Sequence, residues 1–397
     1  MESVFDRKAD CCGCTACASV CPQTAIHMAP DACGFLYPTI DPGLCIDCGL
    51  CRAVCSFSKP NGYERFQECH VVTHHSQEIV NDSRSGGFFT ALSDTILDLD
   101  GVVYGAMLDE NMFVRHVRAV NRDTRNALRK SKYVQSNLDG IFSQAADDLK
   151  AGKYVLFTGT GCQCDGLKGY LHAKHVPDEK LVLCDLVCHG ASSPELFQKY
   201  VAYQEKRFGS RIKEFYFREK ERHPWASHVE KLVFENNRVF YTDEYANLFY
   251  SDDVRPSCNR CKYTSLHRST DLTMADAWGA EVRYPDILKT GASLILVNTS
   301  KGAEFFGKAS RDLLVRDIPI EEVMQPRLME PEPVSPTYDG FWTDYQTLCF
   351  ADFMKKYGVN TYSLPGRLRR RAAWLAKLPK RAAKKMIRGV QRYVRGE

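Results

Sequence analysis

The spacing of cysteines constrains this chain more than any other feature of its sequence. Residues 11–21, CCGCTACASVC, contain four cysteines in the spacing C-x2-C-x2-C-x3-C, and residues 45–55, CIDCGLCRAVC, repeat that spacing. A shift of 34 residues superimposes the two runs position by position. Two equivalent units of the chain therefore each gather four thiols within a short stretch of backbone.

Cysteines with this spacing are typical ligands of cubane iron–sulfur clusters. The two runs resemble the bacterial two-cluster ferredoxin, in which the fourth cysteine of each run binds the cluster of the other run. The resemblance therefore implies two [4Fe–4S] clusters. One would be held by Cys11, Cys14, Cys17 and Cys55, and the other by Cys45, Cys48, Cys51 and Cys21.

A pair of zinc sites is the alternative interpretation of the same cysteines. Structural zinc sites usually use two separated pairs of ligands. Here the same run of four cysteines occurs twice, which favours clusters. Cys12 and Cys33 fall outside the spacing, and no role is predicted for them. Ser56 stands where a proline is expected after Cys55, a change that leaves the number of ligands intact.

Length and composition favour metal ligation over disulfide bonding. The chain has 397 residues and 18 cysteines. It contains no apolar run of about 18 residues that would span a membrane, and its first residues lack the apolar core of a signal peptide. We therefore expect a cytoplasmic protein, in which thiols stay reduced and are free to bind metals.

The pattern of apolar residues predicts a small α+β unit followed by a larger α/β core. Residues 1–60 form the predicted two-cluster ferredoxin domain. Strand and helix patterns then alternate over 68–150 and 151–345, which indicates an α/β core with a largely buried sheet. An antiparallel β insertion is predicted over 213–245, and residues 346–397 are predicted to form a basic helical tail.

Further cysteines suggest a third metal site in this core. Cys258 and Cys261 form a C-x2-C pair that needs two more ligands. Cys162 and Cys188 can supply them, because each lies just beyond the end of a predicted strand, where sites in α/β proteins assemble. The set fits zinc or a [4Fe–4S] cluster, and the neighbouring ferredoxin pattern favours iron. Two other cysteines are predicted to be buried core residues, namely Cys184 and Cys349.

Two glycine-bearing turns separate predicted strands from predicted helices. They are SRSGG at 83–87 and TGTG at 158–161. Backbone N–H groups at such turns favour anionic groups, including a dinucleotide pyrophosphate. Neither turn is a GxGxxG fingerprint, so the residues alone leave phosphate binding and an ordinary turn both open.

Four segments together resemble a known family. They are SRSGGFFTALSDTILDLDGVVYGA, KYVLFTGTGCQCDGL, LVLCDLVCHGASSP and RPSCNRCKYTSLHRSTDLTMADAWGAE. In this order they are similar to the coenzyme F420 hydrogenase/dehydrogenase beta-subunit family, over roughly residues 1–350 and with the ferredoxin domain fused in front. Two positions depart from the family pattern: Gly161 stands where many members have proline, and Ala275 replaces a glycine.

The family resemblance implies an FAD-binding core with its own iron–sulfur centre. It assigns the third set of metal ligands to Cys162, Cys188, Cys258 and Cys261. It also assigns residues near the flavin: Ser85, Gly86, Gly87, Lys132, Tyr133, Gln135, Ser136, Thr158, Thr160, Gln163 and Asp276. No catalytic residue is predicted, because the flavin carries the redox chemistry, and His189, Lys132 and Tyr133 are candidates only for a proton donor.

We expect an oxidoreductase that passes electrons from ferredoxin or a similar carrier through [4Fe–4S] clusters to FAD, and on to a small-molecule substrate of unknown identity. The alternative within enzymes is a subunit that exchanges hydride with coenzyme F420. A further alternative is a non-catalytic electron-transfer subunit of a larger complex. The fused ferredoxin domain favours a one-electron donor.

The C-terminal tail from residue 366 differs in charge from the rest of the chain. From Arg367 onward it contains twelve Lys and Arg residues and one acid, which leaves 41 basic against 48 acidic residues elsewhere. The acidic body argues against a nucleic-acid-binding protein. Two interpretations of the tail stay open: a solvated, partly helical extension, or a basic amphipathic helix that makes peripheral contact with the anionic inner face of a membrane.

Overall fold

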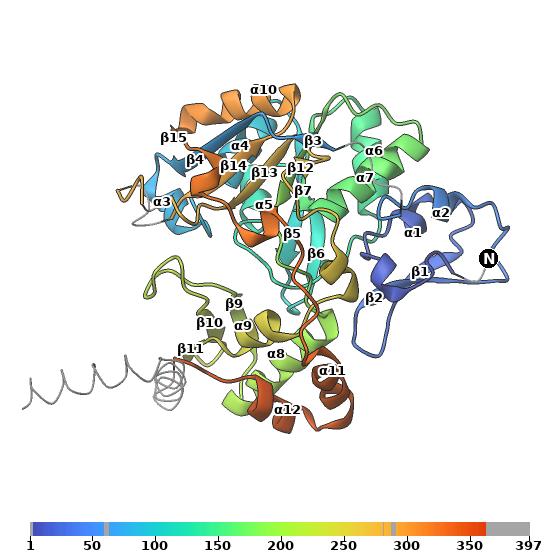
Figure 1. Ribbon diagram of the computed structural model, residues 1–397, viewed down its shortest axis with the longest axis vertical. Helices are drawn as coiled ribbons and strands as arrows, with labels where there is room; N and C mark the ends of the chain where they lie inside the picture. Colours follow the sequence, from blue (N-terminus) through green and yellow to red (C-terminus); the bar gives the residue numbers. More distant parts are fainter. Residues whose placement is uncertain (1–2, 59–62, 281, 287–290, 363–397) are drawn as a thin grey trace, which may run out of the picture.

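The computed structural model describes residues 3–58, 63–280, 282–286 and 291–362 (Figure 1). A large mixed sheet with helices on both faces forms the upper part of the molecule in this view. A smaller antiparallel sheet with its own helices forms the lower part, and the N-terminal segment packs at one side. The predicted mixed α/β architecture is therefore confirmed, whereas the proposed domain boundaries stay predictions.

The two cysteine runs fold into two copies of one loop. Residues with positive φ occupy equivalent places in both copies: Gly13 (71°) matches Asp47 (53°), and Thr15 (66°) matches Gly49 (75°). The repeat in sequence is therefore also a repeat in backbone conformation. The elements of this part are η1 (Lys8–Asp10), α1 (Ala16–Val20), the antiparallel pair β1 (Ile26–Pro30) and β2 (Leu36–Ile40), and α2 (Leu50–Ala53).

Eight strands form the large sheet, in the order β15-β4-β14-β13-β8-β7-β5-β6. The four middle strands, β13, β8, β7 and β5, run parallel to one another, and the strands outside them pair antiparallel. Their bounds are β4 (Glu68–His74), β5 (Val102–Leu108), β6 (Val114–Ala119), β7 (Val155–Thr160), β8 (Leu181–Leu186), β13 (Leu272–Asp276), β14 (Ser293–Val297) and β15 (Leu313–Asp317).

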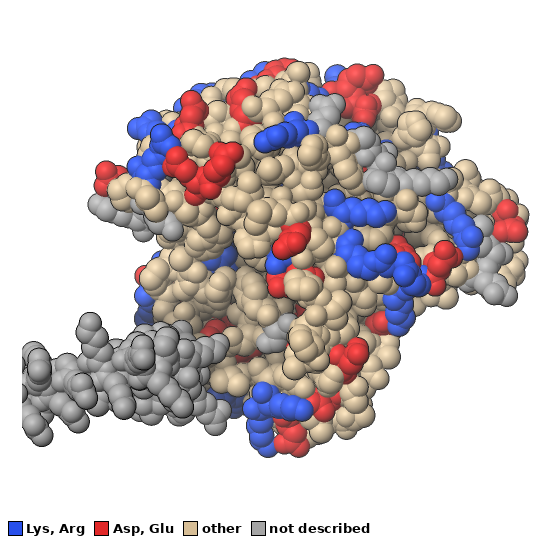
Figure 2. Space-filling model, in the orientation of Figure 1, with Lys and Arg blue, Asp and Glu red and all other residues tan. Residues whose placement is uncertain are grey.

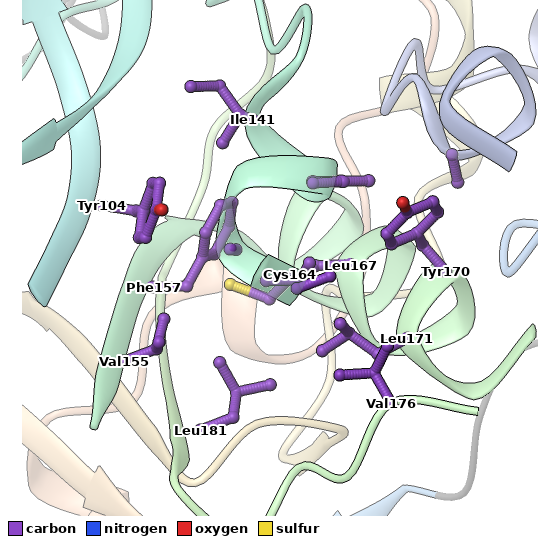
Figure 3. Packing of buried hydrophobic residues seen from close by; sticks show 14 of the residues in the cluster. Tyr104, Ile141, Val155, Phe157, Cys164, Leu167, Tyr170, Leu171, Val176 and Leu181 are labelled. Atoms are coloured by element: carbon purple, nitrogen blue, oxygen red, sulfur yellow. The ribbon is translucent and has the colours of Figure 1, made fainter. Parts of the chain in front are cut away.

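Helices cover both faces of this sheet because its middle strands are apolar on both sides. In β7, Val155 and Phe157 pack on one face and Leu156 packs on the other. Figure 3 shows the first of these cores, with the sulfur of Cys164 among apolar side chains. The covering helices are α6 (Ile141–Lys150) and α7 (Gly161–Ala173) on this face, and α4 (Phe88–Leu97) and α10 (Ser300–Ala309) on the other.

The smaller sheet has the order β11-β10-β9 and is the antiparallel insertion expected from the sequence. Ser193 caps the helix that precedes it, because its side chain accepts a hydrogen bond from Leu196 N and Pro194 occupies the first helical turn. The elements here are α8 (Pro194–Phe208), β9 (Ile212–Tyr216), β10 (Glu230–Phe234), β11 (Val239–Thr242), α9 (Glu244–Ser251), α11 (Tyr338–Thr347) and α12 (Phe350–Tyr357).

The remaining elements are short and connect these layers. They are β3 (Glu64–Arg65), which pairs with β12 (His267–Arg268), together with α3 (Gln77–Asn81), α5 (Arg122–Asn126), η2 (Pro256–Arg260), η4 (Ser310–Asp312), η5 (Ile320–Glu322) and η6 (Pro326–Leu328). The predicted basic tail from residue 366 onward lies outside the described residues. No helix in the described part of the chain is both long and apolar enough to cross a membrane.

One of the two buried-core predictions is wrong. Cys184 on β8 is 0% exposed, as expected. Cys349, in contrast, is exposed at the N-cap of α12, where its sulfur lies 3.1 Å from Asp352 Oδ2. The physical reason is that α12 turns Phe353 and Met354 toward the core and leaves Cys349, Ala351 and Asp352 exposed.

Candidate functional site

Each predicted set of four cluster ligands lines a small cavity of its own. The first cysteine set consists of Cys11, Cys14, Cys17 and Cys55, which line one cavity together. The second cysteine set consists of Cys21, Cys45, Cys48 and Cys51, which line another. The fourth cysteine of each run thus lies with the first three of the other run. This is the exchange that the ferredoxin resemblance implies, and the binding of iron by these thiols stays a prediction.

The two cysteine sets differ in their distance from solvent. Cys14 is 8% exposed, and its set faces the core, whereas Cys48 of the second set is exposed. The loop of the first set touches α7 at Gly166, where a Cβ atom would lie only 2.9 Å from Cys14 Sγ. Figure 1 shows α1 beside α6 and α7, with α2, which carries Cys51 of the second set, farther out. The first set is therefore the inner one.

A large cavity of about 390 Å³ opens at the carboxyl ends of the middle strands. Of the residues predicted to face a flavin, ten line it: Ser85, Gly87, Lys132, Tyr133, Gln135, Ser136, Thr158, Thr160, Gln163 and Asp276. The structure therefore brings together segments that lie far apart in the sequence. The volume is in the usual range for ligand sites. Gly86 alone among the predicted residues does not line this cavity.

Gly86 instead lets the 83–87 loop lie against the sheet. A Cβ atom on Gly86 would be 2.2 Å from Val72 O and 2.7 Å from Ser293 N. The loop is held there by hydrogen bonds from Ser85 Oγ to Ala292 O (2.6 Å) and from Gly86 N to Ser293 Oγ (2.9 Å). The missing side chain is thus what allows this close approach of two backbones.

The turn between β7 and α7 presents a helix N-terminus to the large cavity. Thr160 and Gln163 form a capping box, in which Thr160 N donates to Gln163 Oε1 at 2.9 Å. Such caps satisfy the first N–H groups of a helix. Gly161, which departs from the family pattern, leaves room for its neighbours, since a Cβ there would lie 2.9 Å from Tyr263 Cβ.

The segment 132–136 lines another wall of the large cavity. Lys132 Nζ donates to Arg129 O at 2.6 Å, and burial together with the nearby Lys130 lowers the pKa of Lys132 to about 7. The Tyr133 hydroxyl accepts a hydrogen bond from Arg218 Nη1 at 3.1 Å. Ser136 Oγ is hydrogen-bonded to His116 Nδ1. His189, the third candidate proton donor, also lines the cavity but is exposed.

The third cysteine set consists of Cys162, Cys188, Cys258 and Cys261. Burial raises the pKa of Cys258 to about 11 and of Cys261 to about 12, and the nearby Cys162 contributes to both shifts. Burial also raises the pKa of Cys188, followed by the effects of Cys258, Cys162 and Cys261. The four thiols therefore lie close enough to influence one another. Cys162 and Cys188 line the large cavity.

Cys12, which has no role in the predicted spacing, lies between two of these sites. It lines both the cavity of the first cysteine set and the large cavity. The neighbouring thiols of Cys14 and Cys162 raise the pKa of Cys12 well above its usual value. The first and third cysteine sets are thus neighbours across a single side chain.

No three His, Cys, Asp or Glu side chains of the described ranges are placed to hold a single metal ion.

Most of the charged side chains that line the large cavity are basic. Its described lining includes Arg84, Arg129, Lys130, Lys132 and Arg218, but only one carboxylate, that of Asp276. Asp276 Oδ2 accepts from Arg218 Nη1 at 2.8 Å and lies 3.9 Å from Arg84 Nη2. Arg84 is 8% exposed, and its Nε and Nη1 are buried without a hydrogen-bond partner. A buried cation with free donors points to an anionic group of a ligand.

The arginines of the site were not predicted from the sequence. Arg84 and Arg255 stand within two of the family motifs, SRSGG and RPSCNRC, where the glycines and cysteines carry the resemblance. A basic residue inside a glycine-rich turn was an available signal for Arg84. No such signal existed for Arg218, which lies between β9 and β10 and reaches the site only through the tertiary fold.

Comparison with curated proteins supports the ferredoxin-type part of the chain. A stretch of 42 residues is 50% identical to a protein from Hydrogenibacillus schlegelii described as "Ferredoxin 7Fe". The match covers 11% of this chain and 47% of that protein, so the chain spans about half the length of this curated relative.

Comparison with family models and solved structures concerns the core. The chain is similar to a structure of the F420-reducing [NiFe] hydrogenase complex from Methanosarcina barkeri over 66% of its own length and 85% of the other chain, with 22% identity and a TM-score of 0.48. Residues 152–322 match the family model for the C-terminal part of the coenzyme F420 hydrogenase/dehydrogenase beta subunit. The family resemblance predicted from the four motifs is therefore confirmed over residues 152–322.

Proposed function

We propose that this protein is an iron–sulfur flavoprotein oxidoreductase that passes electrons from ferredoxin or a similar carrier to a small-molecule substrate. One observation carries the proposal: the first cysteine set adjoins the large cavity through Cys12, and the same cavity contains two cysteines of the third set. Thiol groups suited to clusters thus lead from the surface to a cofactor-sized site.

The cysteine sets fit [4Fe–4S] clusters in their chemistry. All 18 cysteines are free thiols, so each is available as a ligand. Each small cavity is lined by the four cysteines of its set, joined by Cys12 in the cavity of the first set, and otherwise mainly by apolar and backbone groups. Buried thiols in apolar surroundings resist ionisation unless a cation stabilises the thiolate, and a bound metal supplies that stabilisation.

The large cavity fits FAD. The free donors of Arg84 and the excess of basic residues suit the pyrophosphate of a dinucleotide, and Gly86 allows the 83–87 loop to approach closely. Ser85, Gln135, Ser136 and Gln163 would hold the cofactor by polar contacts. When bound, a flavin supplies the conversion between single electrons and a hydride.

The second cysteine set is the proposed entry point for electrons. Cys48 is exposed, and Leu44, Ile46 and Leu50 around it are 51%, 61% and 40% exposed. The first cysteine set, in contrast, is covered by α7 and the core. A carrier protein would therefore reach the second set first, and the inner set would connect it to the large cavity.

Lys132 is the best placed of the three candidate proton donors. A general acid works best with a pKa near the working pH, and the pKa of Lys132 is lowered to about 7 by burial and by Lys130. Lys132 lines the large cavity, so it would deliver a proton to a reduced substrate. His189, in contrast, is exposed.

A subunit that exchanges hydride with coenzyme F420 is the second candidate. The observation in its favour is the family model matched by residues 152–322, whose description names this coenzyme. The fused ferredoxin-type segment favours the first candidate, because it suits exchange with a one-electron carrier.

Anaerobic mixing of the purified protein with reduced ferredoxin or with reduced F420 separates the two candidates. We expect reduced ferredoxin to bleach the flavin absorbance, and Cys48→Ala to slow this bleaching at least tenfold. Cys33→Ala is the matched control, because Cys33 lines neither small cavity. Bleaching by reduced F420 but not by reduced ferredoxin would contradict the first candidate and support the second.

A further inference from the structure

Arg255 is a fully buried arginine at the junction of the N-terminal part and the core. It is 0% exposed and stands directly before η2, which carries Cys258. Its guanidinium reaches the loop of the first cysteine set, where Nε donates to Cys11 O at 2.7 Å. Nη1 donates to Leu36 O at 2.9 Å and to Gln135 Oε1 at 3.1 Å. One side chain therefore joins three segments of the fold.

The charge of Arg255 has no carboxylate partner among the described residues. Its other contacts are Cys11 Sγ, 3.5 Å from Nη2, and the rings of Tyr37 and Phe35, whose centroids lie 3.9 Å and 5.9 Å from the guanidinium carbon. Arg125, the other fully buried arginine, lies 2.8 Å from Asp94. Because an unpaired buried cation is strongly unfavourable, the charge that balances Arg255 must come from the cysteines beside it.

We propose that Arg255 is the counter-ion of the iron–sulfur centre held by the first cysteine set, and that it raises the reduction potential of that centre. This inference rests on the proposed function, since it needs the centre to be present. Reduction adds one negative charge, and a nearby buried cation stabilises the more negative state. Net charge and hydrogen bonds to the sulfurs are the main means by which a protein sets such potentials.

The packing around Arg255 keeps this charge in place. Gly13 lies so close that a Cβ atom there would be 3.1 Å from Arg255 Nη1 and 2.3 Å from Gln135 Nε2. The fork of hydrogen bonds to Cys11 O, Leu36 O and Gln135 leaves the guanidinium little freedom to turn away. An arginine, which is planar and always charged, suits this position better than a lysine.

The test is a redox titration followed by electron paramagnetic resonance on the intact protein. In Arg255→Gln we expect the ratio of reduced to oxidised first centre, at a fixed potential, to fall at least about tenfold, which is a shift of about 59 mV for one electron. In Arg255→Lys, which keeps the charge, the shift should be smaller. Unchanged potentials in a folded, iron-loaded Arg255→Gln protein would overturn the inference.

Arg260→Gln is the matched control. Arg260 lies on the same element, η2, and bridges to the same loop through Asp10 Oδ1 at 3.2 Å, but its side chain is 51% exposed. Solvent screens such a charge, so the potential of the first centre should not move. An equal shift in both variants would show that any disturbance of the junction suffices and would overturn the specific role of Arg255.

A second measurement decides the matter if Arg255→Gln does not fold. Wild-type protein labelled with ¹⁵N-arginine should show a weak ¹⁵N coupling in the pulsed spectrum of the reduced first centre, because Arg255 Nη2 lies against Cys11 Sγ. Absence of this coupling would overturn the inference. Wild-type protein without iron would instead refute the proposed function itself, so the two failures are distinguishable.

Discussion

At the scale of single residues, Gly86 determines how closely the 83–87 loop approaches the sheet. The atoms nearest to a side chain added at this position are Val72 O and Ser293 N, which belong to strands β4 and β14 and cannot move aside easily. The clash is therefore with backbone and not with a flexible side chain. Glycine is required here because there is no room for a side chain, and not because the backbone has an unusual φ.

Gly86→Ala should lower the free energy of unfolding by about 1–3 kcal/mol, the usual cost of overpacking a tight site. It should also reduce the flavin content, because the loop that carries Ser85 would be displaced from the cavity wall. Urea denaturation and the flavin absorbance of the purified protein measure these effects.

Gly307→Ala is the control for this substitution. Gly307 lies within α10, and a Cβ there would meet nothing within 4 Å. Alanine should therefore stabilise the helix by up to about 1 kcal/mol and leave the flavin content unchanged. A Gly86→Ala protein as stable as Gly307→Ala would contradict the tight contact between the loop and the sheet.

At the scale of elements, the exchange of the fourth cysteine ties the two loops of the N-terminal part together. Cys55 follows α2 yet lies with the thiols around α1, and Cys21 follows α1 yet lies with the thiols around α2. Each set therefore depends on both halves of the repeat. Loss of one fourth ligand should affect the centre of the other run.

Cys55→Ala and Cys17→Ala should consequently lose the same centre, and Cys21→Ala and Cys51→Ala should lose the other. Each variant should contain about four irons per chain fewer than the wild-type protein. The spectra of the reduced proteins should be alike within each pair and should differ between the two pairs. Cys33→Ala, outside both sets, should keep every centre. Pairing of Cys21→Ala with Cys17→Ala would refute the exchange.

The elements also show what the sequence could reveal and what it could not. Local patterns predicted the repeated cysteine runs and the antiparallel insertion over 213–245, because each depends on residues close together in the chain. The contact between Arg255 and Cys11 joins residues 244 positions apart and leaves no local pattern. Cys349 was misplaced because composition does not show which end of a short helix faces solvent.

The candidate site also contains some features that the sequence predicted and others that only the fold shows. Spacing indicated the first and second cysteine sets, and the family resemblance indicated ten of the residues that line the large cavity. Cys12 was left without a role because the spacing treats each run alone, whereas its position becomes meaningful only when the runs pack against α7. Arg84 was missed because only the fold reveals that its donors have no partner.

At the scale of the whole molecule, the three cysteine sets and the large cavity follow one another from the surface toward the interior. The second cysteine set includes the exposed Cys48, the first set lies against α7, and Cys162 and Cys188 of the third set line the large cavity at the carboxyl ends of the middle strands. Figure 2 shows acidic and basic side chains interspersed over the visible face, without one large patch of a single sign among the described residues. The basic groups that matter for the proposed function line the large cavity instead.

The content of iron, acid-labile sulfide, zinc and flavin per chain, measured on protein purified without oxygen, tests the central claim most directly. Three cubane centres and one flavin predict about twelve irons, about twelve sulfides and one FAD in a brown protein. About eight irons with one zinc would refute a cluster at the third cysteine set. A colourless protein that contains zinc or no metal at all would contradict the whole account.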